Sequence, residues 1–391
     1  MKKNTMIKLA SSAAAVLLTA TSANAGYTMK KKVGDADTKL TFFGFSQIVA
    51  GSGDGFIKDS SDSQVKLGLD RIRLGWKYVS GPVRGKVFLD FAEATDDKED
   101  VGARRVIKDA FIAYKFSDAA VVKAGVIKTP VGMGFTIPGW NLDVVKRGFD
   151  KQLAFERGNG IMISGRDMGM GNNAKVNGLE MGHERPMQGF GYDIMIANQT
   201  TRSGAVAESD GDTTEGNAYM ARLHYDRGEA LHLEVSGGKS PNAAGGNTAS
   251  KDYKVFNIGL DSHFGEGKNI KAEYYDVSGV KGLDHDVETL ALTYTQYVTK
   301  DLEFAIKDIS GKESGAAKGS ADIRNTYVGF NYYPNQVTTK MDRGGKRKNN
   351  QHVIKVNYVA VSGDTETGGW NGANLKAYRD DAVLAMYQFK F

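Results

Sequence analysis

The most regular feature of this chain is a strict alternation of apolar and polar residues. In the segment DRIRLGWKYVSG, every second residue from Ile72 to Tyr78 is apolar, and the alternate positions include Arg71, Arg73 and Lys77. The segment HVIKVNYVAV, near the C-terminus, repeats the pattern. A period of two residues is typical of a β-strand with one buried face, because successive side chains of a strand point to opposite sides.

Many segments of the chain share this period. Sixteen of them qualify as strands, near residues 40–51, 63–80, 83–94, 104–117, 119–129, 158–168, 189–200, 218–227, 230–240, 253–264, 268–278, 286–298, 302–312, 322–333, 352–362 and 381–391. We find no amphipathic helix pattern and no repeat of 20–50 residues, which disfavours solenoids and propellers. The pattern predicts a single all-β domain.

The connections between these segments alternate in length. Short turns such as Gly81-Pro82 are followed by long polar connections, as in an up-and-down barrel with short turns at one rim and long loops at the other. The connections 169–188 and 334–351 are long where this alternation predicts short ones, and we interpret them as turns that carry insertions. The alternative is a soluble β-sandwich, but its strands average only about five or six residues.

Aromatic residues favour the barrel over the sandwich. They recur at or near predicted strand ends, where a membrane-spanning barrel has its interfacial girdles. These residues are Tyr78, Tyr114, Phe116, Tyr225, Tyr297, Tyr332, Tyr333 and Phe391. We therefore predict an all-β fold, a transmembrane antiparallel β-barrel of about 16 strands with up-and-down topology.

Both ends of the chain fit this prediction. Residues 1–25 combine a basic start, a short apolar centre and the small-x-small ending Ala23-Asn24-Ala25, so they are predicted to be a cleaved signal peptide. Residues 26–391 then form the barrel domain in the cell outer membrane. The last strand is expected to pair with the first predicted one, which prevents the fraying usual at a terminus. Its Tyr387, Phe389 and Phe391 resemble the C-terminal signal recognised by the barrel-assembly machinery.

Several segments resemble a known family. VRGKVFLDF, IKDAFIAYKF, VKAGVIKTPVGMG, FERGNGIMISGRDMG and the closing HVIKVNYVAV and YQFKF are similar to strands of the phosphate-selective porin O and P family of Gram-negative outer membranes. The resemblance implies a trimeric barrel of sixteen strands whose third loop, at about 130–157, folds into the pore. It also implies a cationic constriction that prefers anions such as phosphate.

The distribution of charge is consistent with such a constriction. Residues 63–166 contain 18 Lys and Arg against 12 Asp and Glu, a local net charge of +6. A charge is costly on the lipid face of a barrel and tolerated in its lumen, so generic lumen charge is the alternative explanation. The acids Asp143, Asp150 and Glu156 are expected to neutralise the loop in part. The candidate pore-lining residues are Arg71, Arg73, Lys77, Arg84, Lys86, Lys128, Lys146, Arg147, Lys151 and Arg157.

The sequence contains only weak matches to catalytic motifs. The chain has no cysteine, and its six histidines form neither an H-x₃-H pair nor an HExxH motif, so we expect no thiolate or catalytic zinc site. We interpret the glycine-rich segment 169–174 as a turn, the acidic segment 208–217 as a solvated loop, and the basic run 342–350 as a solvated insertion. We expect no catalytic residues, no bound metal, no cofactor and no nucleic-acid partner.

These observations favour a channel over an enzyme. We expect a homotrimeric porin, surrounded by outer-membrane lipid and lipopolysaccharide, through which small hydrophilic solutes and preferentially small anions diffuse. One alternative is a barrel scaffold that sheaths or docks a partner such as a redox protein, or that binds ligands through its long surface loops. An outer-membrane hydrolase is the third interpretation. Conductance of the reconstituted protein distinguishes them.

Overall fold

The computed structural model describes most of the chain after its N-terminal segment. The described residues are 26–52, 65–92, 106–168, 188–198, 216–227, 230–241, 251–265, 267–282, 284–315, 319–334, 351–363, 377–378 and 380–391. The predicted signal peptide, the insertions at 169–187 and 335–350, the acidic segment up to residue 215 and the basic run 342–350 lie outside them. No helix in the described part is both long and apolar enough to cross a membrane.

The described residues form seventeen strands and a few short helices. The strands are β1 (Tyr27–Val33), β2 (Ala36–Ser52), β3 (Lys66–Ser80), β4 (Val83–Asp90), β5 (Ile107–Ser117), β6 (Ala120–Lys128), β7 (Arg157–Met168), β8 (Gln188–Asn198), β9 (Asn217–Arg227), β10 (Leu231–Ser240), β11 (Tyr253–Phe264), β12 (Lys268–Ser278), β13 (Asp286–Tyr297), β14 (Leu302–Gly315), β15 (Gly319–Tyr332), β16 (His352–Gly363) and β17 (Ala382–Lys390). The short helices are α3 (Met133–Thr136) and the 3₁₀ turns η2 (Gly139–Asn141), η3 (Phe149–Leu153) and η5 (Val280–Gly282).

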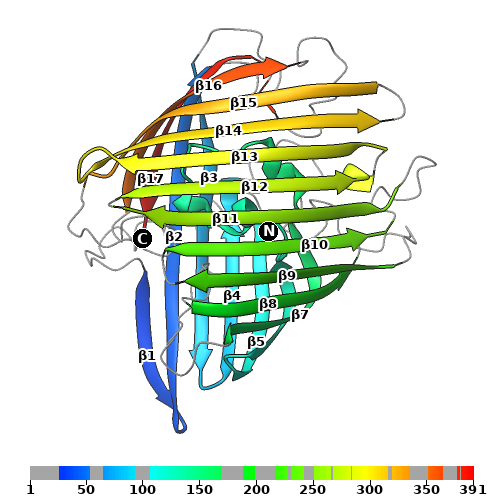
Figure 1. Ribbon diagram of the computed structural model, residues 1–391. Coiled ribbons are helices and arrows are strands. Elements are labelled where there is room, and N and C mark those ends of the chain that lie inside the picture. Colours follow the sequence, from blue (N-terminus) through cyan, green and yellow to red (C-terminus); the bar gives the residue numbers. More distant parts are fainter. Residues whose placement is uncertain are drawn as a thin grey trace, which may run out of the picture.

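Strands β2 to β17 close into a barrel. Each pairs antiparallel with the next along the chain, and β17 pairs with β2 from Val383 opposite Ser52 to Lys390 opposite Phe45. Figure 1 shows β8 to β16 forming one wall, with β2 to β5 behind it. The sixteen predicted segments coincide with β2 to β17 to within a few residues at each end. The predicted fold class is therefore confirmed.

Strand β1 is an addition that the sequence pattern did not predict. Its sequence YTMKKKV has three consecutive lysines and no clear alternation, and the whole strand is exposed. It pairs with the first half of β2, from Tyr27 opposite Phe42 to Val33 opposite Ala36. The ladder between β17 and β2, which we call the barrel seam, ends at Phe45 of β2. Strand β1 pairs with the part of β2 that lies before this ladder. Figure 1 shows it projecting beyond the other strands.

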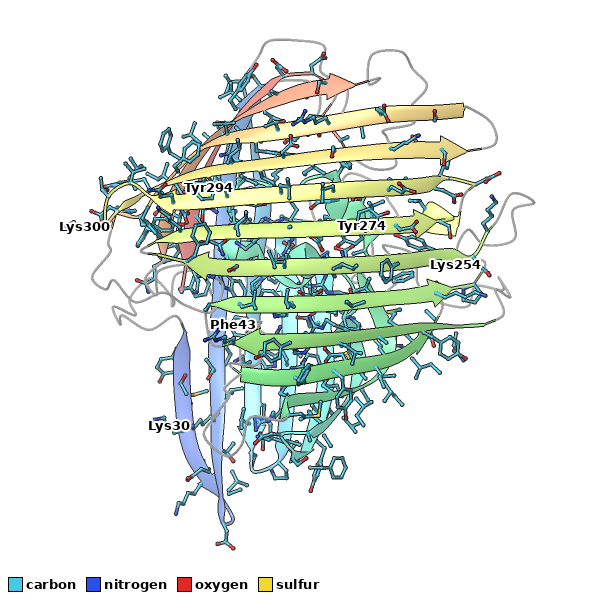
Figure 2. All side chains as sticks on the ribbon, viewed as in Figure 1. Lys30, Phe43, Lys254, Tyr274, Tyr294 and Lys300 are labelled. Atoms are coloured by element: carbon cyan, nitrogen blue, oxygen red, sulfur yellow. The ribbon has the colours of Figure 1, made fainter. Side chains whose placement is uncertain are left out.

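The two faces of the barrel differ in polarity. On β9, Tyr219 and Leu223 are 57% and 67% exposed on the outside, whereas Arg222 and His224 are buried inside at 2% and 3%. Apolar side chains outside and polar ones inside are the arrangement of barrels that lie in lipid. Among the labelled residues of Figure 2, Lys254 and Lys300 mark opposite ends of the barrel.

The predicted aromatic girdle needs corrections at Tyr297 and Tyr333. Tyr297 pairs with the buried, lumen-facing Glu303, and residues paired across a ladder share a face. Tyr332 lies on the outer face and is 43% exposed, but Tyr333 is buried and its hydroxyl donates a hydrogen bond to Glu303 at 2.8 Å. The physical reason is that neighbouring residues of an extended chain point to opposite faces. Tyr332 therefore belongs to the outer girdle, and Tyr333 does not.

A β-bulge in β3 controls which residues face the lumen. Gln47 of β2 pairs with Arg71, and the next residue Ile48 pairs with Leu69, so Asp70 is an extra residue in the ladder. In a regular strand Leu69 and Arg71 would share a face. Because of the bulge, Leu69 is 48% exposed outside, whereas Arg71 is buried inside at 6%.

The barrel seam extends to the last residue of the chain. The backbone N–H of Gly44 donates to the carbonyl oxygen of Phe391 at 2.9 Å, and the N–H of Phe391 donates back to Gly44 at 3.0 Å. The phenyl ring of Phe391 covers Gly44 so closely that a Cβ atom there would lie 2.6 Å from it. An aromatic ring over a strand glycine is a known device for fixing register. The terminus is thus held by backbone pairing and ring packing together.

Candidate functional site

The connection between β6 and β7, residues 129–156, packs against the inner wall of the barrel. It contains α3, η2 and η3, of which α3 contacts β11 and η3 contacts β12 and β13 (Figure 1). Its apolar side chains, such as Val145 and Leu153, are fully buried. They belong to one apolar cluster with inward residues of the wall, among them Tyr275 and Ile309. Burial of this apolar surface stabilises the connection on the wall.

Side-chain amides from four strands hold the backbone of this connection. The amide groups of Gln47, Asn331 and Gln388 donate to its carbonyl oxygens at 3.0, 2.8 and 3.2 Å. The amide oxygen of Asn357 accepts a hydrogen bond from the N–H of Val145 at 2.7 Å. We call these four residues the wall amides; each is at most 1% exposed. A buried amide without its partner costs about 1–3 kcal/mol, so these bonds fix the position of the connection.

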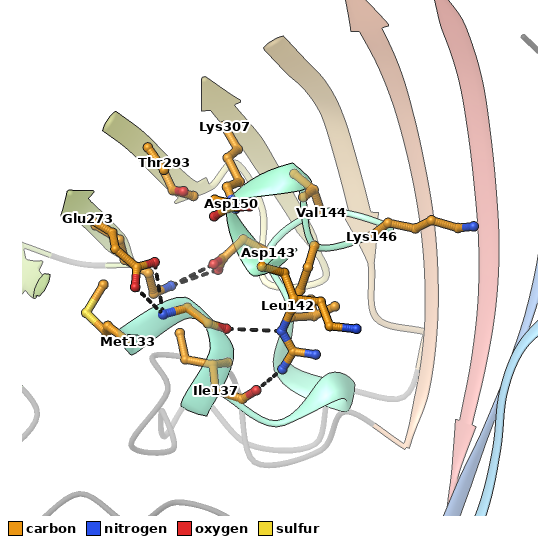
Figure 3. A pocket seen from close by; sticks show the side chains of 15 residues that line it. Met133, Ile137, Leu142, Asp143, Val144, Lys146, Asp150, Glu273, Thr293 and Lys307 are labelled. Carbon is orange, nitrogen blue, oxygen red and sulfur yellow. Dashed lines mark hydrogen bonds and ion pairs between the residues drawn. The ribbon is translucent and has the colours of Figure 1, made fainter. Parts of the chain in front are cut away.

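Two acids of the connection form ion pairs with the opposite wall. Asp143 accepts hydrogen bonds from Lys271 of β12 at 2.8 and 2.9 Å, and Asp150 accepts one from Lys307 of β14 at 2.7 Å. Figure 3 shows these contacts together with Glu273, whose carboxylate accepts from the N–H of a residue in α3. The charges of Asp143 and Asp150, which the sequence suggested would offset the loop's own cations, are therefore balanced in part by wall lysines.

A cavity lies between the connection and strands β3 to β7, and we call it the basic cavity. Its empty space, including the part that is open to solvent, is about 750 Å³. Six basic side chains and two acidic ones line it, an excess of four positive charges. The basic ones are Arg73, Lys86, Lys128, Arg147, Lys151 and Arg157, and the acidic ones are Asp109 and Glu156. All six cations are among the candidates predicted from the sequence.

The wall cations of the basic cavity are held by acids of neighbouring strands. Arg73 Nε lies 2.7 Å from Asp90, and Lys86 Nζ lies 2.6 Å from Asp109. Asp109 also pairs with Arg157, at 3.1 Å. One carboxylate therefore serves two cations, which leaves the cavity positive. Such pairing positions the cations and offsets their charge only in part.

Two cations contact the backbone of the connection: Lys128 at the end of β6 and Arg147 of the connection itself, which we call the loop cations. Lys128 donates to the carbonyl of Thr136 at 3.1 Å, and Arg147 donates to the carbonyls of Gly134, at 3.0 Å, and Ile137. Burial and the nearby Arg71, Arg73 and Arg157 lower the pKa of Arg147 to about 9. Its guanidinium therefore stays charged at neutral pH, and the lowered pKa reflects first its burial and then the cations grouped around it.

Aromatic rings hold several of these cations in place. The guanidinium of Arg73 lies 5.7 Å from the ring centres of both Phe45 and Phe88. The ammonium of Lys128 lies 4.6 Å from the ring of Phe135. At such distances a ring face attracts a cation. The rings orient the charged groups and exclude water from one side of each.

The other four candidate residues lie apart from the basic cavity. Arg71 forms an ion pair with Asp70 at 2.5 Å and Lys146 approaches the same carboxylate at 3.5 Å. Lys146 borders the neighbouring cavity shown in Figure 3. Lys77 and Arg84 are nearer the β3–β4 turn and border neither cavity.

The sequence reasoning missed two sets of lumen charges. Lys271 and Lys307, described above, face the connection from the far wall. A buried cluster in β7 to β9 joins Asp193 to Arg166 and Arg222, both at 2.7 Å. The alternation of β9 and β12 is visible in the sequence, but it does not show which residues of strands distant in sequence lie side by side in the lumen.

Comparisons with known proteins identify the fold class. No family model and no curated protein matches the chain. Among solved structures, OmpF of Salmonella typhi superposes with a TM-score of 0.59 at 13% identity, over 93% of this chain and 100% of that one. The outer-membrane channel DcaP of Acinetobacter baumannii gives 0.60 at 14% identity, over 94% and 100%. An anion-selective porin from Comamonas acidovorans gives 0.56 at 14% identity, over 90% and 100%. At these identities the likeness concerns the fold, which is that of Gram-negative outer-membrane porins.

Proposed function

We propose that this protein is an outer-membrane porin through which small hydrophilic solutes diffuse passively, with a preference for anions. The observation that carries the proposal is the basic cavity: six cations and two acids gather where the connection 129–156 meets the wall. The apolar outer face of the barrel supports the membrane location. A lumen lined with grouped charges suits the passage of solutes, so we propose a channel and not an enzyme.

The physics of such a lumen favours anions. Walls of low dielectric constant focus the field of fixed charges into the water between them, which raises the local concentration of the opposite ion. Permeation also requires weak binding at several sites, so that each ion leaves as readily as it enters. The basic residues form such a series, from Arg71 and Lys146 through the basic cavity to Lys77 and Arg84.

For the permeant we propose small oxyanions such as phosphate. Arginine offers a planar fork of donors that matches oxyanion geometry, and lysine offers a mobile point charge. The sequence resemblance to phosphate-selective porins and the anion-selective porin among the structural neighbours support this choice. We also propose a homotrimer, because one neighbour, OmpT of Vibrio cholerae, is described in a trimer form. The mass of the purified complex tests the trimer.

Reversal potentials test the channel and its selectivity together. The purified protein is reconstituted in a planar bilayer with a gradient of potassium chloride across it. We expect open-channel steps and a reversal potential whose sign shows that chloride crosses more readily than potassium. Silent bilayers would refute the channel, and a potential of the opposite sign would refute the anion preference. With the channel established, adding phosphate should reduce the chloride current if phosphate binds within the pore, and an unchanged current would refute phosphate as a permeant.

A further inference from the structure

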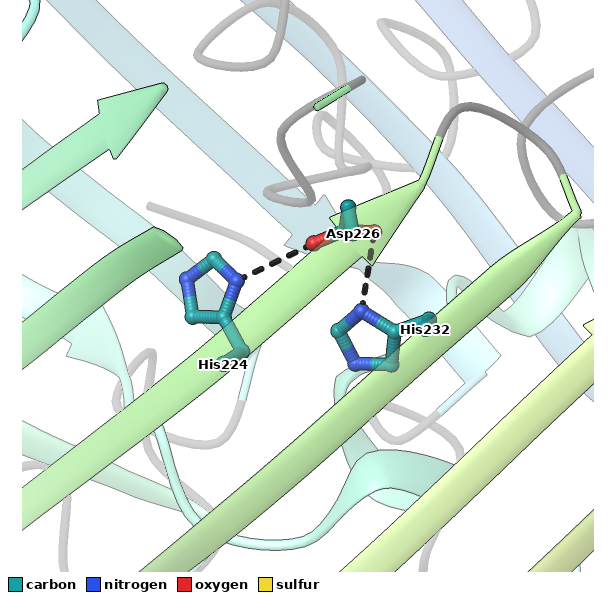
Figure 4. A group of neighbouring side chains, drawn as sticks. All are labelled: His224, Asp226 and His232. Atoms are coloured by element: carbon teal, nitrogen blue, oxygen red, sulfur yellow. Dashed lines mark hydrogen bonds and ion pairs between the residues drawn. The ribbon is translucent and has the colours of Figure 1, made fainter. Parts of the chain in front are cut away.

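Two histidines and two carboxylates form a rectangle on the inner wall at the hairpin of β9 and β10. His224 and Asp226 lie on β9, and His232 and Glu234 lie on β10, with one outward residue between the members of each pair. The strand register places His224 opposite Glu234 and Asp226 opposite His232. All four side chains are buried, at 4% exposure or less. Figure 4 shows both imidazole rings directed at the carboxylate of Asp226.

The distances suit three ligands of one metal ion. Nδ1 of His224 lies 3.2 Å from one oxygen of Asp226, and Nδ1 of His232 lies 2.9 Å from the other. One ligand atom from each residue can be chosen so that all three lie within 4.8 Å of one another. In a tetrahedral zinc site with bonds of about 2.0–2.1 Å, the ligand atoms are about 3.4 Å apart. The distances from both rings to Asp226 are therefore close to those between the ligands of a zinc site.

The hydrogen bonding of the rings is incomplete without a cation. His232 faces carboxylates with both nitrogens, since its Nε2 lies 3.0 Å from Glu234, and a neutral imidazole has only one N–H. If Nδ1 of His224 donates to Asp226, its Nε2 has no hydrogen-bond partner, although the side chain is completely buried. Protonating His232 satisfies that residue but leaves Nε2 of His224 unsatisfied.

A divalent metal ion resolves the conflict at His232 and gives Nδ1 of His224 a partner, so that Nε2 of His224 can carry the proton. With the metal on both Nδ1 atoms and Asp226, the Nε2–H of His232 donates to Glu234, which is the usual outer carboxylate of a metal-bound histidine. The Nε2–H of His224 then faces the carboxylate of Asp193, 4.0 Å away. The neighbouring Gly191 leaves the ring its space, because a Cβ atom there would lie 2.4 Å from Cε1 of His224.

We propose that this rectangle binds one divalent transition-metal ion of borderline softness, such as Zn²⁺, Co²⁺ or Ni²⁺. Imidazole with carboxylate is the ligand set that such ions prefer, whereas Ca²⁺ and Mg²⁺ favour oxygen alone. Nδ1 of His224, Nδ1 of His232 and Asp226 are the ligands, and Glu234 is a positioning residue. The ion joins β9 to β10 beside their turn, apart from the basic cavity. The site was not predicted from the sequence, because the two histidines are brought together by strand register and not by a motif within one element.

Metal binding to the detergent-folded protein tests the proposal. We expect about one Zn²⁺ per chain after dialysis, and zinc X-ray absorption should report two imidazole ligands. The double change His224→Gln, His232→Gln should lower the affinity at least 100-fold, and Glu234→Gln by about 10- to 100-fold. The matched control His285→Gln, His352→Gln removes two histidines elsewhere and should bind normally. Heat-modifiable migration on a gel verifies that each variant is folded.

Absence of stoichiometric zinc in the wild-type protein would overturn the proposal, as would an absorption spectrum without two imidazoles. Equal loss of binding in the control would also overturn it. The spectrum of the wild type does not depend on any variant, so the test holds even if the double variant fails to fold. Channel activity is not the readout, which keeps this result separate from the proposed function.

Discussion

At the scale of single residues, the bulged Asp70 opposes the basic lumen around it. Its carboxylate pairs with Arg71 at 2.5 Å and attracts Lys146 at 3.5 Å. Two unit charges about 8 Å apart interact by roughly 2 kcal/mol at an effective dielectric constant of about 20. A single inward acid is therefore expected to influence every permeating ion.

We predict that Asp70→Asn raises the ratio of anion to cation permeability. The change removes one negative charge from the lumen and keeps the shape of the side chain. The reversal potential in dilute salt measures the effect, which should shrink at about 0.15 M salt, where the screening length is about 8 Å. Asp118→Asn is the matched control, because Asp118 is 63% exposed at the β5–β6 turn. A lowered ratio in Asp70→Asn would contradict the assignment of Asp70 to the lumen field.

At the scale of elements, the connection 129–156 depends on the wall amides. We predict that the double change Asn331→Ala, Asn357→Ala frees part of its backbone, because it removes the partners of Asp143 and Val145. Single-channel conductance should rise and become noisier, while anion selectivity falls. Asn325→Ala is the control, since this equally buried asparagine holds Tyr378 instead. Unchanged conductance in the double variant would mean that the connection does not restrict the pore.

The packing between β17 and β2 can also be tested by substitution. A Cβ atom on Gly44 would lie 2.5 Å from the carbonyl oxygen of Arg73 and 2.6 Å from the ring of Phe391. We predict that Gly44→Val destabilises the closed barrel by about 1–3 kcal/mol, the usual cost of overpacking. The yield of heat-modifiable protein should fall, whereas Gly68→Ala should fold normally, since its new Cβ would meet its nearest neighbour at 3.9 Å. Normal folding of Gly44→Val would refute the role of this packing.

These elements also show how far sequence reasoning reaches. Alternation identified the barrel strands because a residue's face depends only on its position in the strand. It missed β1, whose lysines conceal any alternation, and the aromatic girdle drawn from it placed Tyr297 and Tyr333 on the wrong face. Six of ten candidate cations border the basic cavity. The partners of Lys271 and His224 were not predictable, because strand register and the path of the connection join residues that are distant in sequence.

At the scale of the whole molecule, the barrel joins an apolar outer face to a lumen with grouped positive charge. The basic cavity owes its charge to two sources, the wall strands β3 to β7 and the connection that packs against the far wall. The wall cations are paired with acids, so removing them would leave buried carboxylates without partners. The loop cations Lys128 and Arg147 contact backbone carbonyls, which makes them better subjects for neutralisation.

The most direct test of the account is the reversal potential of a loop variant in dilute salt. We predict that Lys128→Gln, Arg147→Gln, Lys151→Gln lowers the anion-to-cation permeability ratio severalfold, because each removed charge contributes about 2 kcal/mol at a distance of 8 Å before screening. The control Lys254→Gln, Lys300→Gln, Lys312→Gln removes three exposed charges outside the basic cavity and should retain most of the selectivity. A loop variant with the wild-type reversal potential would contradict the account, because the basic cavity would then not govern which ions pass.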